Sequence, residues 1–286
     1  MGTAFVQAVK YHYPNATIDL VAKKGIDFLL EYFPAHGQRY IFSKEEYKGL
    51  IGVIKFGKMI KAQKKYDLFF CLPDSFSSAA MGFAIAATQR VGFKKELLSI
   101  FLTHAYSKKK NIHRVEEYID LLQQFTKEII TPRVQLQPMT LEKKNTLVIN
   151  INSEATSRRL PKEKAISIIA ATRKEIINEI ILVGSNKEAA FVKEVYNALP
   201  DKTNITNQAG KTNLTELILL FNSSTTMLTT DSGPAHVANA LGTHTVVLFG
   251  AGNENNTAPY NKNNSTIIRL GQLNCEPCVS NSCKLY

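Results

Sequence analysis

Residues 231–236, DSGPAH, concentrate chemically active side chains in one short stretch between two apolar runs. The run 225–230 before them predicts a β-strand. A helix is predicted over 234–242, starting at Pro234, where the missing N–H costs nothing, and closed by Gly242. A further apolar run predicts the next strand. The start of the helix is therefore expected at the carboxyl edge of a parallel sheet, where α/β proteins bind ligands.

The start of this predicted helix has the properties of an anion site. Unpaired N–H groups and the helix dipole favour a phosphate there. Gly233 permits close backbone approach, Ser232 can donate a hydrogen bond, and His236 can face the same anion. The alternative is that Asp231 or Ser232 only caps the helix and that His236 is an ordinary surface residue. These residues alone leave both interpretations open.

The elements around this stretch alternate between strand and helix. Strand-like runs cover 145–151 and 179–185, and helical spacing covers 161–176, 187–199 and 213–224. Apolar strands separated by helices of about three turns indicate a parallel sheet covered on both faces. The second half of the chain is therefore predicted to be an α/β lobe.

The first half has a similar but less regular pattern. Helices are predicted at 4–13, 49–65, 76–88 and 114–129, and strands at 17–22 and 66–72. Residues 131–145 contain two prolines and no helical period, which predicts a linker between a lobe at 1–135 and a lobe at 136–286. Because the chain opens within a helical pattern, we expect the first lobe to lack the strand with which such domains normally begin.

Charge is unevenly spread along the 286 residues, whose net charge is +11. Residues 1–145 hold 22 Lys+Arg against 13 Asp+Glu, and residues 146–286 hold 13 against 11. A basic first half favours a polyanionic partner, such as nucleic acid, an acidic membrane surface or a phosphorylated glycolipid, although a solvated lysine-rich surface is the simpler explanation of the charge alone. No apolar run approaches the ~20 residues of a membrane span, so we expect a cytoplasmic protein.

The four cysteines do not form a disulfide framework for a chain of this length. Cys275 and Cys278 have a zinc-like C-x-x-C spacing, and Cys283 follows them, but no second pair or downstream histidine supplies a fourth ligand. We expect reduced thiols and no metal site. Cys71 lies in an apolar run and is expected in the core.

The stretch 207–260 resembles the signature region of glycosyltransferase family 9, the ADP-heptose:lipopolysaccharide heptosyltransferases. It follows the family pattern of A-G-K-T-S-L-x-E-L, a strand, D-S/T-G-P-x-H-x-A-x-A-x-G, another strand and F-G. The segment LPDSFSSA at 72–79 is similar to the heptosyltransferase II branch, and SRRLP at 157–161 and CEPCVSNSC near the end also resemble family segments. The resemblance covers essentially the whole chain.

The resemblance implies a GT-B fold of two Rossmann-like lobes with parallel sheets. The first lobe would bind the acceptor and the second the nucleotide sugar. The donor-binding residues that it implies are Asp231, Ser232, Gly233, Pro234, His236, Lys211, Arg158 and Glu188, with Glu188 placed for the ribose. Asp74 and Ser75 would contact the acceptor, and Lys108, Lys109 and Lys110 would contact its anionic groups unless they form a solvated run.

The implied chemistry is inverting transfer of a heptose from ADP-heptose, or a related nucleotide sugar, to the lipopolysaccharide inner core of a Gram-negative bacterium. It needs neither a metal nor a cofactor, and it places the protein in the cytoplasm with peripheral contact at the inner membrane. The family's general base, an Asp after the first strand, aligns before Met1, and family chains continue past Cys283. We therefore expect a chain truncated at both ends, with no catalytic residue assigned. Asp67 and Asp74 are the nearest acidic candidates.

Two smaller departures concern the donor. Leu160 stands where the family has a tryptophan, and ININSEA at 149–155 lacks the family's P-G. The sequence thus leaves three functions open: a heptosyltransferase, a family relative that uses another nucleotide sugar, and a non-catalytic sugar-nucleotide or glycolipid binder without the base. Nucleic acid is not an expected partner, because the basic half has no aromatic–basic motif.

Overall fold

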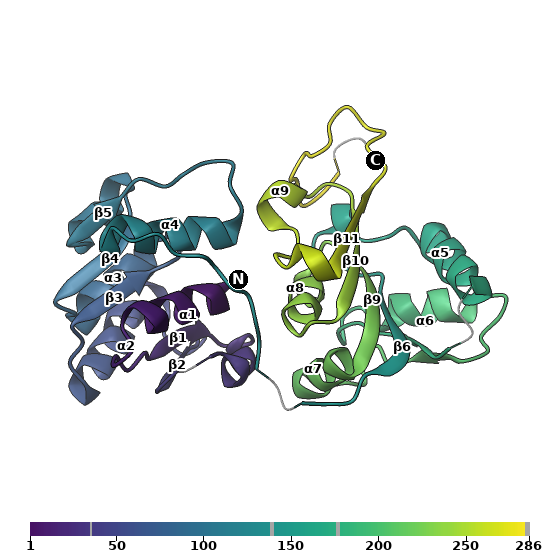
Figure 1. The fold of residues 1–286 in the computed structure, drawn as a ribbon, viewed down its shortest axis with the longest axis horizontal. Coiled ribbons are helices and arrows are strands. Elements are labelled where there is room, and N and C mark those ends of the chain that lie inside the picture. The colour runs from purple at the N-terminus through teal and green to yellow at the C-terminus, as the bar shows by residue number, and fades with distance from the viewer. Residues whose placement is uncertain (35, 138–139, 176–177, 284–286) are drawn as a thin grey trace. The chain divides into compact units, whose positions relative to one another are not determined.

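The computed structural model describes residues 1–34, 36–137, 140–175 and 178–283. The chain forms two compact units, Met1–Arg133 and Val134–Tyr286 (Figure 1). No helix in these described ranges combines the length and apolar character needed to cross a bilayer.

The first unit alternates strands and helices. In chain order it contains α1 (Gly2–His12), β1 (Leu20–Lys23), η1 (Asp27–Tyr32), β2 (Arg39–Phe42), α2 (Gly49–Gln63), β3 (Leu68–Cys71), α3 (Phe76–Ile85), β4 (Gln89–Phe93), η2 (Glu96–Phe101), β5 (His104–Tyr106) and α4 (Arg114–Thr126). The strands form two parallel sheets, β1-β2 and β3-β4-β5, and no pairing joins these sheets within the described residues. The sequence patterns predicted β1 and β3 but missed β2, β4 and β5.

Helices cover both faces of the first unit because side chains alternate along its strands. In β3, Phe69 packs with the core of α2 and α3, which includes Phe56. Its neighbour Phe70 points the other way and meets the rings of Phe5 in α1 and Phe125 in α4 at 5.0 and 5.6 Å between centroids. The two apolar sets place α2 and α3 on one face and α1 and α4 on the other.

The second unit is built on one sheet. It contains β6 (Lys144–Asn150), η3 (Thr156–Arg158), α5 (Lys162–Glu175), β7 (Ile180–Leu182), α6 (Ala189–Asn197), β8 (Ile205–Asn207), α7 (Leu214–Ser223), β9 (Ser224–Thr230), α8 (Gly233–Ala240), β10 (His244–Phe249), α9 (Glu254–Thr257), η4 (Lys262–Asn264) and β11 (Ser265–Arg269). All strand pairs are parallel, and the spatial order is β11-β10-β9-β6-β7-β8.

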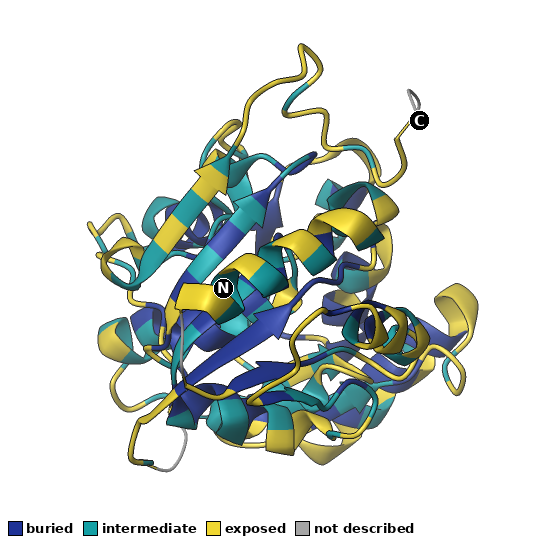
Figure 2. Cartoon of the chain, turned by 90° about the vertical axis from the view of Figure 1, so that its right-hand side faces the viewer, coloured by how far each residue is buried: buried dark blue, intermediate teal, exposed yellow. Residues whose placement is uncertain are grey.

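This order reverses direction at β6. From β6 the chain runs outward through β7 and β8, then returns to β9 on the other side and continues through β10 to β11. Helices α5 and α6 cover one face of the sheet and α7 and α8 cover the other, so the strands are largely buried (Figures 1 and 2). The order is that of a doubly wound nucleotide-binding domain, whose ligand site lies where the strand order reverses.

Helix α8 forms where the sequence predicts it but is shifted at both ends, and its last residue is Ala240. It begins at Gly233 rather than at Pro234, which occupies the second helical position. The proline is tolerated there because that N–H also has no partner within the helix. Gly242 follows the helix with a φ of 79°, a left-handed conformation that glycine adopts without steric cost.

Candidate functional site

The carboxyl ends of β6 and β9 carry a cluster of buried polar side chains at the point where the strand order reverses. Asn150 of β6 lies opposite Thr229 of β9 in the sheet. Its Nδ2 donates to Thr229 Oγ1 and to Ser232 Oγ, both at 3.1 Å. Ser232 Oγ in turn donates to the Thr230 carbonyl at 3.1 Å. The turn after β9 is thus held by the strand beside it.

Asn152, in the loop that follows β6, continues this cluster. Its side-chain Nδ2 donates to Asn150 Oδ1 and to the Val183 carbonyl, each at 3.2 Å. Asn152 is 1% exposed, and its Oδ1 has no hydrogen-bond partner within the described residues. A buried acceptor without a partner is costly to a fold, so it marks this cluster as a place where a ligand or water can bind.

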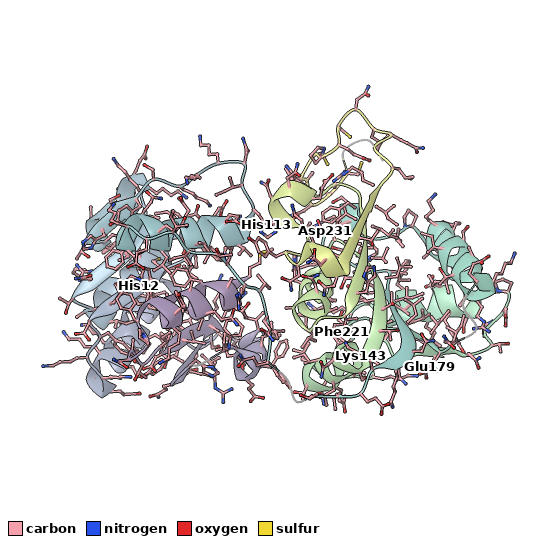
Figure 3. The ribbon with its side chains drawn as sticks, viewed as in Figure 1. His12, His113, Lys143, Glu179, Phe221 and Asp231 are labelled. Atoms are coloured by element: carbon pink, nitrogen blue, oxygen red, sulfur yellow. The ribbon has the colours of Figure 1, made fainter. Side chains whose placement is uncertain are left out.

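Asp231 follows β9 directly (Figure 3). It is 4% exposed. Arg158, from the loop after β6, donates from Nη1 to its Oδ2 at 3.3 Å. Burial raises the pKa of the Asp231 carboxyl, and the charges of Arg158 and Arg269 oppose that increase. The structure therefore brings together two of the predicted donor-binding residues from loops about 70 residues apart, as neighbouring strands allow.

Arg269, at the end of β11, fixes the loop after β10. Its guanidinium donates to the carbonyls of Gly250 and Gly252 and pairs with Glu254 at 2.6 Å and Glu276 at 3.3 Å. The ion pair with Glu254 raises the pKa of Arg269 and lowers that of the glutamate. Its planar fork suits this set of converging acceptors, which a lysine could not satisfy together.

At the start of α8 no side chain of the described residues accepts a hydrogen bond from the first backbone N–H groups of the helix. Ser232 is the N-cap residue, but no side chain caps α8. Asp231 binds Arg158, and Ser232 binds the Asn150 cluster, so the interpretation of these two residues as simple helix caps is wrong. A Cβ at Gly233 would meet no atom within 4 Å. The start of α8 therefore leaves room for a ligand atom next to the backbone, and Pro234 and His236 lie in its first turn, half-buried.

The two remaining donor-site predictions lie farther along the same edge of the sheet. Glu188 follows β7, and its Oε2 accepts hydrogen bonds from the Ser185 N–H at 2.8 Å and hydroxyl at 2.7 Å. Lys211 follows β8, is exposed, and donates to the Asn207 carbonyl at 2.8 Å. Because β8 is three strands from β9, Lys211 lies roughly 14 Å along the sheet from Asp231. An extended nucleotide could span this length, with its phosphates at β6 and β9.

The predicted acceptor-binding residues of the first unit lie between β3 and α3. Asp74 forms an ion pair with Lys108 at 3.2 Å, and this interaction lowers the pKa of Asp74. Ser75 caps α3 by accepting from the Ser78 N–H at 3.3 Å. Lys108 also pairs with Glu117 at 3.4 Å. Asp74 is thus part of a charged network, whereas Ser75 has a structural role that the sequence did not predict.

The lysine run at 108–110 is not simply solvated. Lys108 pairs with Asp74 and Glu117, and Lys109 pairs with the buried carboxylate of Asp120.

The three cysteines near the end of the chain are exposed, and the described residues include no group of three metal-ligating side chains. Cys71 is buried as expected.

Sequence patterns missed three residues that organise this site. Asn150 and Asn152 end an otherwise apolar strand pattern, and two polar side chains at that position were the available signal. Arg269 had no such signal, because β11 was not predicted and its partners lie in separate loops. Leu160, which replaces a family tryptophan, packs against the core beneath α5 and α6.

The strand order and the polar cluster at its reversal define the second unit as a Rossmann-like ligand-binding domain. Residues 53–286 match the family model described as glycosyltransferase family 9 (heptosyltransferase). The chain belongs to this family and is a glycosyltransferase.

The chain is similar to the lipooligosaccharide heptosyltransferase 2 of Haemophilus influenzae, with 28% identity over 94% of this chain and 84% of the relative. It also resembles the solved structure of Escherichia coli ADP-heptose lps heptosyltransferase II, with a TM-score of 0.78 and 23% identity over 95% of this chain and 87% of that one. A third likeness is to E. coli heptosyltransferase WaaC with ADP, with a TM-score of 0.75 and 17% identity over 93% and 88% of the two chains. These structural neighbours confirm the GT-B fold class.

Proposed function

We propose that this chain transfers a heptose from ADP-heptose to the inner core of a lipopolysaccharide, with inversion at the anomeric carbon and without a metal ion. The observation that carries the proposal is the meeting of Arg158, Asp231 and the open start of α8 where the strand order reverses. Heptose and a lipopolysaccharide acceptor are proposed because the similar proteins are heptosyltransferases of such molecules. The donor diphosphate fits the combination of a cation and free N–H groups at a helix start.

In this proposal an acceptor hydroxyl attacks the anomeric carbon and releases its proton to solvent as the bond from that carbon to the diphosphate oxygen breaks. Arg158 and the N–H groups at Ser232 and Gly233 stabilise the negative charge that develops on the leaving diphosphate. Asp231 holds Arg158 in place through the 3.3 Å contact. Glu188 hydrogen-bonds the ribose, and Lys211 contacts the outer part of the nucleotide.

The first unit would bind the acceptor at a membrane surface on the cytoplasmic side. Asp74 would contact the acceptor, but it is a poor choice for the base. Its pair with Lys108 lowers its pKa, which makes the carboxylate weakly basic. We therefore assign no general base among the residues that surround these sites.

Product formation tests the proposal directly. The protein is incubated with ADP-heptose and lipopolysaccharide truncated within its inner core, with and without EDTA, and ADP release is followed together with the mass of the lipopolysaccharide. We expect stoichiometric ADP and one added heptose, unchanged by EDTA, with the inverted anomer by NMR. Transfer only from a different nucleotide sugar would replace ADP-heptose as donor. Binding without turnover for every donor would contradict the enzymatic assignment.

A further inference from the structure

Three neighbouring segments of the first unit, α2, α3 and η2, expose several large apolar side chains. Fifteen large hydrophobic residues are exposed among those described, and six of them lie on α2, α3 and η2. These six are Leu50, Ile51, Phe76, Phe83, Leu97 and Ile100. We call the exposed side of α2, α3 and η2 the α2–α3 surface. Exposed apolar side chains on neighbouring helices, unlike singly scattered ones, are typical of an interaction site.

The exposure follows from how α2 and α3 pack. The inward side of α2 is buried through Val53, Phe56 and Ile60. Gly57 lies so close to Ala84 of α3 that a Cβ there would overlap it, which keeps the two helices tightly together. The core of this layer is therefore complete without the outward residues. Ile51, which is 84% exposed, has no role in the packing of its own unit.

The charges on α2 have one sign, and η2 adds one exposed carboxylate, that of Glu96. Helix α2 carries Lys55, Lys58 and Lys61 and no acidic residue, and α3 carries no charge at all. Within the described ranges, no carboxylate forms an ion pair with any of these three lysines. This differs from Lys108 and Lys109 of the same unit, which are paired. The α2 lysines are thus available to an external anion.

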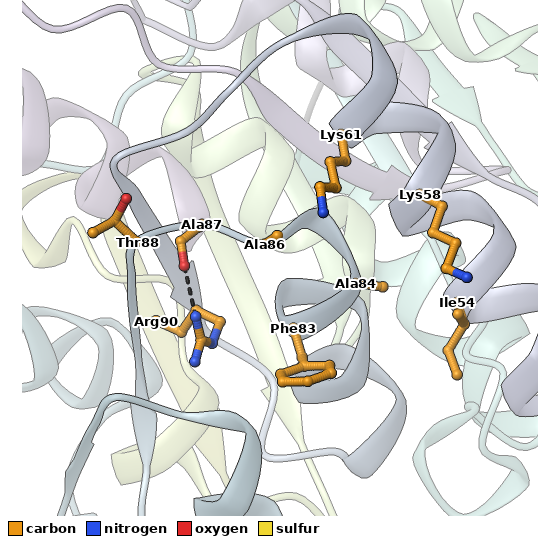
Figure 4. Close-up of a pocket in the computed structure, with 9 residues that line it drawn as sticks. All are labelled: Ile54, Lys58, Lys61, Phe83, Ala84, Ala86, Ala87, Thr88 and Arg90. Carbon is orange, nitrogen blue, oxygen red and sulfur yellow. Dashed lines mark hydrogen bonds between the residues drawn. The ribbon is translucent and has the colours of Figure 1, made fainter.

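A pocket of about 470 Å³ lies on this surface (Figure 4). Ile54 and Phe83 provide apolar walls, and Lys58, Lys61 and Arg90 provide cations. Arg90 is held in place, donating to the Phe101 carbonyl at 2.8 Å and the Ala87 carbonyl at 2.6 Å. Its guanidinium also lies 5.6 Å from the centre of the Phe83 ring. A fixed cation beside apolar walls suits a phosphate that carries an apolar chain.

We propose that the α2–α3 surface docks onto an anionic phospholipid bilayer, with a lipid phosphate at Lys58, Lys61 and Arg90. Cations around an exposed apolar face are the combination that binds the headgroup boundary of a membrane. Ile51 and Ile100 would enter that boundary as the lysines contact the phosphates. A nucleic acid would use the cations but not the apolar residues, and an acidic protein would not depend on lipid charge. The inference rests on the proposed membrane contact of the first unit and not on the transfer chemistry.

Vesicle flotation tests this docking. The full chain is mixed with vesicles of phosphatidylcholine alone or with 30% phosphatidylglycerol, at about 0.05 and 0.5 M salt. We expect flotation with the anionic vesicles at low salt and much less at high salt. The triple variant Lys55→Glu, Lys58→Glu, Lys61→Glu should lower the partition coefficient about 100-fold or more. If wild-type protein did not float with anionic vesicles at low salt, the proposal would be wrong.

Matched variants distinguish vesicle binding through the α2–α3 surface from nonspecific attraction due to the net charge of the protein. Lys164, Lys174 and Lys193 are exposed lysines of the second unit, and their change to Glu alters the net charge equally. This control should keep most of the flotation. Ile51→Ser should weaken flotation about tenfold, whereas Ile129→Ser, at a site 97% exposed and outside the α2–α3 surface, should not. Equal losses in the two lysine triples would overturn the assignment to α2 and α3.

The transfer reaction is measured separately with a deacylated, water-soluble acceptor. The α2 triple variant should form product at the wild-type rate in this assay while failing to float with vesicles. If wild-type protein floats but forms no product with any donor, the proposed function fails and the docking surface stands. If product forms but flotation is unaffected by the α2 changes, the docking proposal fails alone.

Discussion

The backbone of Gly252 lies against the carboxylate of Asp231 so closely that a Cβ there would overlap its Oδ2. Asp231 follows β9 and Gly252 follows β10, two strands that pair side by side. Arg269 holds the Gly252 carbonyl from the next strand, β11. The orientation of the Asp231 carboxylate is therefore set by the backbone of a separate loop, as well as by Arg158.

Replacement of Gly252 by alanine should destabilise the second unit. The added methyl must displace either the loop after β10 or the buried Asp231 carboxylate, and such overpacking costs about 1–3 kcal/mol. Urea denaturation followed by circular dichroism would measure the loss in free energy of unfolding. A change below about 0.5 kcal/mol would show that the loop moves freely and does not fix Asp231.

Gly233→Ala should weaken ADP binding without destabilising the second unit, unlike the change at Gly252. No atom lies within 4 Å of the position that its Cβ would occupy, so the folded chain accommodates the methyl. We expect unchanged stability, or a gain of about 0.4–1 kcal/mol from the less flexible unfolded chain. ADP affinity by calorimetry should fall at least about tenfold, because the methyl occupies the approach to the start of α8. Equal affinity for the two proteins would place the diphosphate elsewhere.

Asp231→Asn should change how stability depends on pH. Burial raises the pKa of Asp231 in the folded protein, so the folded state holds this proton more tightly than the unfolded chain. The resulting stabilisation is full below the unfolded pKa, about 3.9, and is lost as the pH rises through the folded value. The uncharged variant should therefore be more stable than wild type at pH 7, and the advantage should shrink toward pH 4. Denaturation curves from pH 4 to 8 would measure the difference in free energy of unfolding between the variant and wild type. If the variant's extra stability grew as the pH fell, the predicted direction of the pKa shift would be wrong.

Arg158→Met should weaken ADP binding about 10- to 100-fold, which corresponds to the loss of one hydrogen bond between charged groups. Calorimetry with ADP measures the effect. Lys162→Met is the matched control, because Lys162 lies four residues away and pairs with Glu194 at 3.3 Å on α6. Similar affinity losses in the two variants would point to overall charge rather than to a specific contact.

Arg269→Met should cost about 2–3 kcal/mol in the free energy of unfolding, because it leaves two carboxylates and two carbonyls without their shared donor. Limited proteolysis should then cut residues 270–283 faster than in wild type. The surface change Lys162→Met should cost less than about 1 kcal/mol and leave proteolysis unchanged. Intact tails in the Arg269 variant would show that other contacts hold this segment.

Sequence patterns predicted most of the second unit, because its long strands and helices have clear apolar periods. They missed β8 and β11 there, and β2, β4 and β5 in the first unit. These strands are three to five residues long, and some contain polar residues such as His104, Asn207 and Arg269. Such strands form because neighbouring strands offer them hydrogen bonds, a condition that no local pattern reveals.

The same distinction applies to the candidate site. Asp231, Ser232 and Gly233 could be predicted because a strand, a turn and a helix start are encoded within one short stretch. The family resemblance placed Arg158 and Asp231 at one donor site, but neither the contact between them nor the restriction at Gly252 was predicted. These depend on which strands are neighbours, and the order β10-β9-β6 is a property of the whole sheet.

The segment after β11 also makes the site accessible to spectroscopy. Val279 N–H donates to the Ala251 carbonyl at 2.8 Å, and Ser157 Oγ donates to the Ser280 carbonyl at 2.5 Å. Cys278 is exposed beside these contacts, whereas burial raises the pKa of the Cys71 thiol to about 12 and keeps it unreactive. Once the other exposed cysteines, Cys275 and Cys283, are changed to serine, a fluorescent maleimide at Cys278 should report in real time when a nucleotide enters or leaves the loops around Asp231.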